Sequence, residues 1–340
     1  MASNYTDYIV FIHGVNTRQN STDPDYAKKL ITLLENEVKH NSPELNIKSI
    51  PLYWGDVNKD AEKELLGKLN QSTTWQNMWF KNMREQQIMQ FAGDAALYIS
   101  RQKGSRIVDK LKEQAVEGLE NRPSEARLHL VTHSWGTVIL FDILFASRWE
   151  DPNIPAYESV QGIRRQIYGM SPQPEQGIRL ASIHTMGSPI SLFSLLDVTQ
   201  GEEQAQGKSE SKYPNSSSHD ITPKLEEFLE ELGKSNRGMK LPWNNFMHPG
   251  DPIAYPLESV IYSLVDGKRK YLNIQDVLIP TSGFSNFLFQ QVSQSPLPLL
   301  LNGGNAHGSY WESQTVAQKI AETIKQQSLI SSEQKQLITA

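Results

Sequence analysis

The sequence has 340 residues, of which 38% are hydrophobic and 21% charged, so it can bury the core of one large domain or two modest ones. Its net charge of −5 argues against a nucleic-acid-binding protein and against a polybasic membrane anchor, and the absence of cysteine excludes disulfides and thiolate chemistry. We find no secretory signal pattern and no apolar run of membrane-spanning length. We therefore expect a soluble, cytoplasmic protein without a transmembrane segment.

Short apolar runs alternate with helical patterns along the chain. The apolar periodicity predicts helices over residues 25–40, 137–147 and 312–327. It predicts strands at residues 8–12, 47–54, 127–132, 178–186 and 270–279. Strands separated by helical segments predict an α/β fold with a mostly parallel sheet and helices on both faces.

Two segments differ in texture from this framework. Residues 57–121 are rich in Lys, Glu and Gln, with apolar residues at three- and four-residue intervals, which predicts a helical insertion into a core formed by residues 1–56 and 122–330. The insertion either packs on the core or forms a cap whose Trp75 and Trp79 line a substrate channel. Residues 200–220 contain almost nothing to bury and are predicted to form a mobile surface loop.

Ser134 is the candidate nucleophile, in the segment Thr132-His-Ser-Trp-Gly136 between a predicted strand and a predicted helix. A tight strand-to-helix turn exposes a serine hydroxyl above the sheet edge and needs small residues on either side. Gly136 meets this need, whereas the β-branched Thr132 stands where glycine is usual. The backbone N–H of Trp135 and the helix N-terminus would favour developing negative charge. The alternative is an ordinary helix N-cap.

A serine needs a general base, and that base needs an orienting acid. Most of the eight histidines lie in predicted strands, beside the serine or in solvated stretches, which leaves His248 and His307. His307 follows a Gly/Asn-rich loop before the last helix, from which its ring could reach the serine. The alternative is a surface histidine.

Asp251 is the candidate acid, because the Pro-Gly and Asp-Pro pairs around it predict a turn after a strand. It could instead be only a turn former, and Asp197 and Asp266 are weaker candidates. A second oxyanion donor should follow an early strand, where Gly14 lets the backbone curl inwards and the N–H of Val15 is the candidate.

Taken together, these segments resemble the α/β-hydrolase superfamily, and more closely its lipase- or esterase-like bacterial members. The resembling segments are Val10–Gly14, Leu130–Gly136, Thr185–Pro189, Trp243–Phe246 with Asp251–Ala254, and His307–Trp311. The order serine, aspartate, histidine is that of α/β-hydrolases. The resemblance implies Ser134, Asp251 and His307 as the catalytic triad, with no cofactor or metal.

The sequence thus predicts a serine hydrolase that cleaves a carboxylic ester, which could be a lipid ester. We assign His13, Gly14 and Phe246 to the substrate-binding surface, with the two tryptophans of the insertion. An amidase or peptidase with the same triad, or a non-catalytic scaffold that binds a partner through residues 57–121, are the alternatives.

Overall fold

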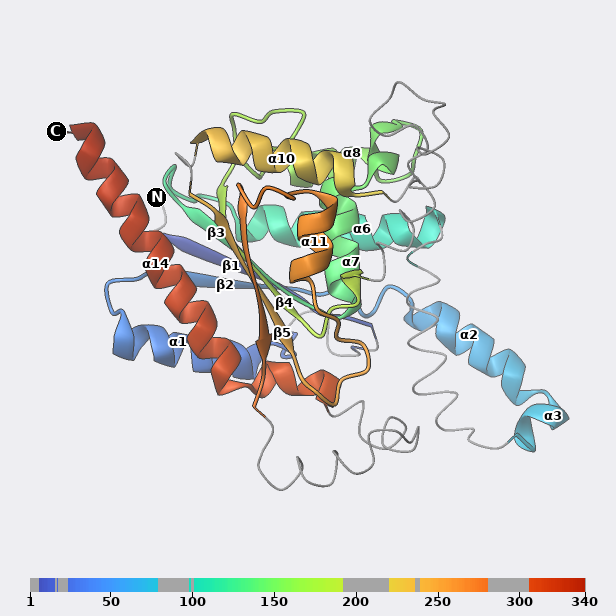
Figure 1. Cartoon of the computed structure of the whole chain (residues 1–340). Coiled ribbons are helices and arrows are strands. Elements are labelled where there is room, and N and C mark those ends of the chain that lie inside the picture. The colour runs from blue at the N-terminus through green and yellow to red at the C-terminus, as the bar shows by residue number, and fades with distance from the viewer. Residues whose placement is uncertain are drawn as a thin grey trace.

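Among the residues that the structure describes, six strands form one sheet in which every pairing of adjacent strands is parallel (Figure 1). The strands are β1 (Asp7–Ile12), β2 (Ile47–Leu52), β3 (Arg127–His133), β4 (Arg179–Met186), β5 (Leu241–Met247) and β6 (Leu272–Leu278). This computed structural model describes residues 6–15, 17, 24–78, 98, 101–191, 220–235, 239–280 and 306–339. The predicted α/β fold with a parallel sheet is confirmed.

The strand order is β2-β1-β3-β4-β5-β6. The chain moves from β1 to β2 on one side and then returns to place β3 on the other side of β1. The direction of winding therefore reverses between β1 and β3. In open parallel sheets, ligands bind outside the carboxyl ends of the strands at such a reversal.

Helices cover both faces of the sheet (Figure 1), and the central strands β1, β3, β4 and β5 are buried along almost their whole length. The edge strand β6 is partly exposed. Side chains of β1 alternate between the two layers: Tyr8, Val10 and Ile12 join one apolar cluster, and Ile9 and Phe11 the other. The first cluster lies under α6 (Arg101–Gly118), α7 (Trp135–Phe145), α8 (Tyr157–Arg164), α10 (Thr222–Ser235) and α11 (Glu258–Leu264). The second lies under α1 (Lys28–Asn41) and α14 (Gln314–Thr339).

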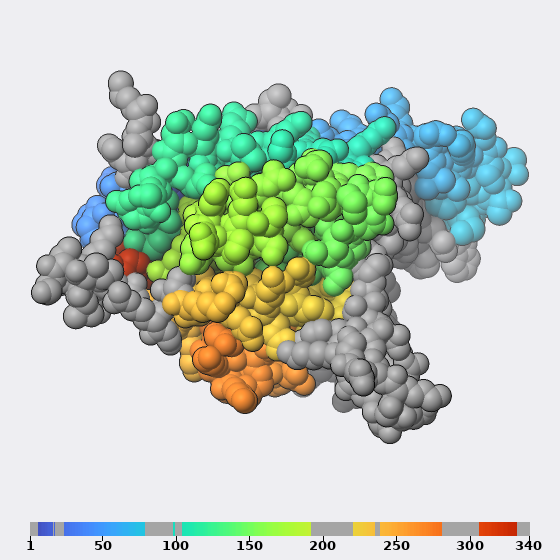
Figure 2. Space-filling view, turned by 90° about the horizontal axis from the view of Figure 1, so that it is seen from above, coloured from blue at the N-terminus to red at the C-terminus, as the bar shows by residue number. Residues whose placement is uncertain are grey.

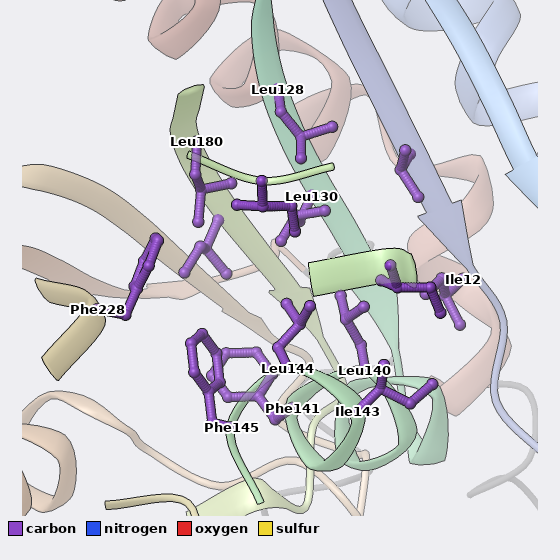
Figure 3. Packing of buried hydrophobic residues seen from close by; sticks show 14 of the residues in the cluster. Ile12, Leu128, Leu130, Leu140, Phe141, Ile143, Leu144, Phe145, Leu180 and Phe228 are labelled. Carbon is purple, nitrogen blue, oxygen red and sulfur yellow. The ribbon is translucent and has the colours of Figure 1, made fainter. Parts of the chain in front are cut away.

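The helix after the candidate nucleophile, α7, is buried at every residue after Trp135. A helix that is apolar on all sides must be covered on all sides, and here the sheet, α8 and α10 surround it. Figure 3 shows Phe141, Leu144 and Phe145 of α7 packed towards Leu130 of β3 and Phe228 of α10. The position of the turn before α7 is therefore fixed by the core.

The described residues of the segment 57–121 form two structural parts. Its C-terminal helix α6 packs on the core through Ile107, Val108 and Leu111. By contrast, α2 (Lys59–Asn70) and α3 (Thr73–Gln76) bury no residue and project from one end of the molecule (Figures 1 and 2). Whether this segment caps the site stays a prediction.

The structure differs from the predicted elements near the C-terminus. The last helix continues to Thr339 instead of ending near residue 327, and residues 306–308 form a helical turn rather than a loop, followed by the 3₁₀ helix η4 (Ser309–Glu312). Of the predicted mobile loop 200–220, all but Asp220 lies outside the described residues. Within the described part of the chain, no helix combines the length and apolarity needed to cross a bilayer.

Candidate active site

The candidate catalytic residues meet at the carboxyl edge of the sheet. Ser134 follows β3, Asp251 follows β5, and His307 lies beyond β6. Gly14 follows β1 and Gly187 follows β4 at the same edge. Because parallel strands all end on one side, residues more than 290 positions apart are brought together at the winding reversal.

Ser134 occupies a strained turn between β3 and α7. Its backbone has φ 54° and ψ −131°, a region that non-glycine residues rarely adopt and that costs about 1–3 kcal/mol. Its N–H donates to the carbonyl of Met186 at 2.9 Å, and its own carbonyl accepts from the N–H of Thr137 at 3.1 Å. An unstrained N-cap needs no such backbone, so this strain distinguishes Ser134 from an ordinary cap.

Two glycines allow the backbone to close around this turn. A Cβ added to Gly136 would lie 2.4 Å from the carbonyl oxygen of His13, and one added to Gly14 would lie 2.6 Å from the Cβ of Ser134. Real side chains do not tolerate such distances, so both positions require glycine. The chain after β1 therefore passes directly beside Ser134.

Thr132 is accommodated although glycine is usual at its position. Its side chain is fully buried, and its hydroxyl is hydrogen-bonded to that of Thr137 at 2.8 Å. This bond links the end of β3 to the first turn of α7. The threonine thus stabilises the turn through this hydrogen bond instead of disrupting it.

His307 and Asp251 form the hydrogen-bonded pair predicted from the sequence. The Nδ1 of His307 lies 3.0 and 2.9 Å from the two carboxylate oxygens of Asp251. Burial alone would raise the pKa of Asp251, but hydrogen bonds from His307, Tyr310 and the N–H of Ile253 hold that pKa below its ordinary value. The ionised carboxylate can only accept, so the proton sits on Nδ1 of His307 and Nε2 carries the free lone pair.

The Oγ of Ser134 and the Nε2 of His307 are both buried, and neither has a hydrogen-bond partner among the described residues. A buried polar atom without a partner costs about 1–3 kcal/mol, so two of them in one site call for an explanation. The backbone bond from Ser134 to Met186 brings the serine beside Gly187. A Cβ on Gly187 would lie only 3.1 Å from Nδ1 of His307. A hydroxyl donor and a basic nitrogen, both unused, thus lie on either side of one glycine.

His133 connects the turn at Ser134 to the segment that carries His307. Its Nε2–H donates to the backbone carbonyl of His307 at 2.6 Å, and the two rings lie 4.6 Å apart between centroids. Burial, together with the neighbouring His307, lowers the pKa of His133 to about 3, so the ring is neutral. The sequence argument did not predict this link.

Several other predicted site residues are used elsewhere. His13 is buried, with Nδ1 bonded to the carbonyl of Gly14 at 2.6 Å and Nε2 accepting from the N–H of Trp54 at 3.1 Å, so it joins strand ends instead of facing a substrate. Phe246 is fully buried in the cluster under α1 and α14. The assignment of these two residues to the substrate-binding surface is therefore corrected, because both side chains are buried in contacts with neighbouring strands and helices.

The remaining candidates either have other partners or lie outside the described residues. The carboxylate of Asp266 accepts backbone N–H groups of residues 270–272 and stabilises a turn before β6. His248 Nδ1 accepts from the N–H of Gly250 at 3.0 Å. Trp75 is half-buried on the projecting α3, whereas Trp79 and Asp197 lie outside the described residues. Among the described residues, no group of three or more His, Asp and Glu side chains could hold a metal ion.

Two contributors to the site were missed from the sequence. Gly187 has φ +55°, and any side chain there would meet Asp251 at 2.7 Å. Tyr310 donates its hydroxyl to Asp251 at 2.7 Å. A Gly-Ser-Pro segment after a predicted strand and a tyrosine one helical turn after His307 were the available signals.

No protein-family model matches this chain, and no curated protein is detectably similar to it in sequence. Among solved structures, it is similar to two of inhibited esterase B from Lactobacillus rhamnosis, one of them with a tributyrin phosphonate. Sequence identity is 11% in both, TM-scores are 0.39 and 0.38, and the matches cover 100% of this chain and 82% and 81% of those chains. The α/β-hydrolase fold follows instead from the parallel six-stranded sheet, its strand order and the strained turn at Ser134.

Proposed function

We propose that the protein is a serine hydrolase that cleaves carboxylic esters, with Ser134 as nucleophile, His307 as general base and Asp251 as the orienting acid. The observation that carries this proposal is the pair of buried, unpartnered atoms, Oγ of Ser134 and Nε2 of His307. Their cost to stability is explained if both are reserved for a substrate and for the proton that passes between them.

The first half of the reaction forms an acyl-enzyme. Oγ of Ser134 attacks the ester carbonyl while Nε2 of His307 takes the hydroxyl proton, and Asp251 stabilises the resulting imidazolium through Nδ1–H. The carbonyl oxygen becomes negatively charged and accepts hydrogen bonds from the backbone N–H groups of Val15 and Trp135. The C–O bond then breaks, and His307 gives its proton to the leaving alcohol.

The second half releases the acid. His307 removes a proton from water, the hydroxide attacks the acyl carbon, and the same two N–H groups hold the second oxyanion. The bond to Oγ breaks and Ser134 recovers its proton from His307. The N-terminus of the buried helix α7 adds a fixed positive potential at the developing charge.

The acyl group that best fits this site is apolar, as in a lipid ester. Val15 and Trp135, which supply the two N–H groups, are partly buried hydrophobic side chains packed against the larger apolar cluster. They would therefore offer a nonpolar wall directly beside the oxyanion. Apolar chains gain binding energy from such a wall in proportion to the area that they bury.

Labelling with a fluorophosphonate tests the proposal directly. Wild-type protein should react in one-to-one ratio, with the adduct mapped by mass spectrometry to Ser134, and Ser134→Ala should not react. Ser182→Ala is the matched control and should label normally, because Ser182 is fully buried within β4. Absence of labelling would favour a non-catalytic scaffold, and faster turnover of acyl amides than of matched esters would favour an amidase.

A further inference from the structure

Tyr310 donates a hydrogen bond to the carboxylate of Asp251. It lies on η4, three residues after His307, and its side chain is fully buried. Its hydroxyl oxygen accepts the N–H of His248 at 2.9 Å and lies 2.7 Å from Oδ2 of Asp251. Because an amide N–H can only donate, the phenolic proton is directed to the carboxylate.

The bonds to Asp251 leave its carboxylate little freedom to rotate. Oδ1 accepts the N–H of Ile253 at 2.9 Å, Oδ2 accepts the Tyr310 hydroxyl, and both oxygens face Nδ1 of His307. Only one of these bonds comes from a side chain that could be changed without touching the triad. Tyr310 also stays a donor, since burial and the nearby Asp251 charge raise the pKa of the phenol well above its ordinary value.

We infer that Tyr310 is a positioning residue for the hydrolytic reaction, which fixes Asp251 and limits how strongly that carboxylate draws the Nδ1 proton of His307. The inference rests on the proposed function for its catalytic consequence, although the hydrogen-bond geometry is independent of it. Each hydrogen bond to an ionised carboxylate stabilises its charge, and the carboxylate becomes a weaker base towards its other donors. Loss of the phenol should therefore disturb the orientation of Asp251 and strengthen its bond with His307.

A purely structural role for Tyr310 makes a different prediction. Its ring packs in the cluster under α1 and α14, so large truncation would damage the core whatever the hydroxyl does. Tyr310→Phe keeps the ring and removes only the hydroxyl. Tyr98→Phe is the matched control, because Tyr98 is also buried and donates to a carboxylate, that of Asp142, at 2.6 Å.

The experiment compares wild type, Tyr310→Phe and Tyr98→Phe in two measurements. Steady-state hydrolysis of 4-nitrophenyl butyrate should show kcat reduced about 10- to 100-fold in Tyr310→Phe with KM little changed, the loss expected for one hydrogen bond to a charged group. In proton NMR, the Nδ1–H resonance of His307, assigned by its absence in His307→Gln, should move downfield in Tyr310→Phe. Tyr98→Phe should change neither quantity.

An unchanged Nδ1–H resonance together with normal kcat in Tyr310→Phe would overturn the inference, and equal effects in Tyr98→Phe would reassign it to general packing. The NMR measurement needs no turnover. A shifted resonance in a protein that hydrolyses no ester would therefore reject the proposed function and retain the positioning contact. Esterase activity of the wild type, with normal kinetics and an unmoved resonance in Tyr310→Phe, would retain the proposed function and reject the positioning role of Tyr310.

Discussion

The described part of the chain contains two sets that each consist of a Ser, a His and an Asp side chain. The set at the carboxyl edge is Ser134, His307 and Asp251. The second set, Ser182, His129 and Asp7, lies within β4, β3 and β1 and is fully buried. In this second set His129 Nδ1 is 2.7 Å from the Ser182 hydroxyl and Nε2 is 3.1 Å from Asp7.

The second set belongs to a continuous chain of hydrogen bonds under α14. Asn244 donates to Nδ1 of His184, which fixes the proton of that ring on Nε2 and directs it to the Ser182 hydroxyl at 2.8 Å. The Ser182 hydroxyl in turn donates a hydrogen bond to Nδ1 of His129. The Nε2–H of His129 donates to Asp7, which also forms an ion pair with Arg127. Burial lowers the pKa of His184 well below its ordinary value, in keeping with a neutral ring.

The two sets have the same residue types but differ in how many of their hydrogen bonds are formed and in the backbone conformation of the serine. Every link of the buried set is made, and none of its three residues has a positive φ. At the carboxyl edge the serine backbone is strained, and the serine–histidine link is open, with both atoms unpartnered within the described part of the chain. The buried set is thus complete as a structural network, whereas the open serine–histidine link at the sheet edge supports the proposed catalytic role.

The sharpest contrast is between the two serines. Ser134→Ala should reduce ester turnover on the order of 10⁶-fold without loss of stability, because it removes an unpartnered hydroxyl. Ser182→Ala should keep activity but lower the free energy of unfolding by about 1–3 kcal/mol, because two buried ring nitrogens lose their partner. Ester hydrolysis and urea unfolding measure the two effects. A Ser134→Ala variant with a tenth of wild-type activity would place the nucleophile elsewhere.

The two aspartates should differ in the same way. Asp251→Asn should lower turnover by roughly 10⁴-fold, because the amide favours the wrong tautomer of His307, with substrate binding little changed. Asp7→Asn should leave turnover intact and destabilise the fold by about 3–5 kcal/mol, since Arg127 would lose its buried partner. Kinetics and thermal unfolding of both variants test this. Near-normal turnover in Asp251→Asn would reject its orienting role.

Two glycines next to His307 extend the comparison to the backbone: Gly187 lies beside its ring in space, and Gly308 follows it in the sequence. Gly187→Ala should reduce turnover by about 10²-fold or more, because its Cβ would displace Asp251 and His307 from their positions. Gly308→Ala, at φ −86° and with no described atom within 4 Å of an added Cβ, should be neutral. Equal activity of the two variants in an esterase assay would contradict the close packing at Gly187.

The buried set should also set the acid stability of the protein. Burial alone would raise the pKa of Asp7, but hydrogen bonds from His129 and Arg127 lower it from 3.8 to about 2. A carboxyl with a depressed folded pKa stabilises the fold above its unfolded pKa, and that stability is lost as pH falls between the two values. The loss between pH 4 and pH 2 should be about 2 kcal/mol in wild type. Urea unfolding across this range should show this contribution absent in Asp7→Asn.

The smallest expected effect concerns the helical insertion. If α3 reaches over a bound acyl chain, Trp75→Ala should reduce turnover of long-chain esters about tenfold or less and spare acetate esters, since a short chain cannot contact it. Hydrolysis of matched 4-nitrophenyl esters gives this ratio. Leu65→Ala, at an exposed position on α2, is the control. An unchanged ratio would limit Trp75 to packing within the projecting helices.

Local signals in the sequence were sufficient to predict five of the six strands, β5 being the exception, and to select Ser134, Asp251 and His307 as candidates. Apolar periodicity is a local property that survives in any tertiary context, and the strained turn depends on neighbours one or two positions away, such as Gly136. The prediction that His129 and His184 are packed within strands is confirmed by their burial, because side chains of the central strands lie between two layers of helices.

Only the tertiary structure decided which polar groups pair and which stay open. A register shift in the pairing of β3 and β4 after Leu128 sets His129 opposite Ser182, and no local pattern encodes such a shift. His13 was lost as a substrate contact because β2 ends beside it and Trp54 uses its ring. Tyr310 entered the site because a helical turn, where a loop was expected, directs it to Asp251. Composition and periodicity determine which segments are buried, whereas hydrogen-bond partners depend on distances between segments far apart in the chain.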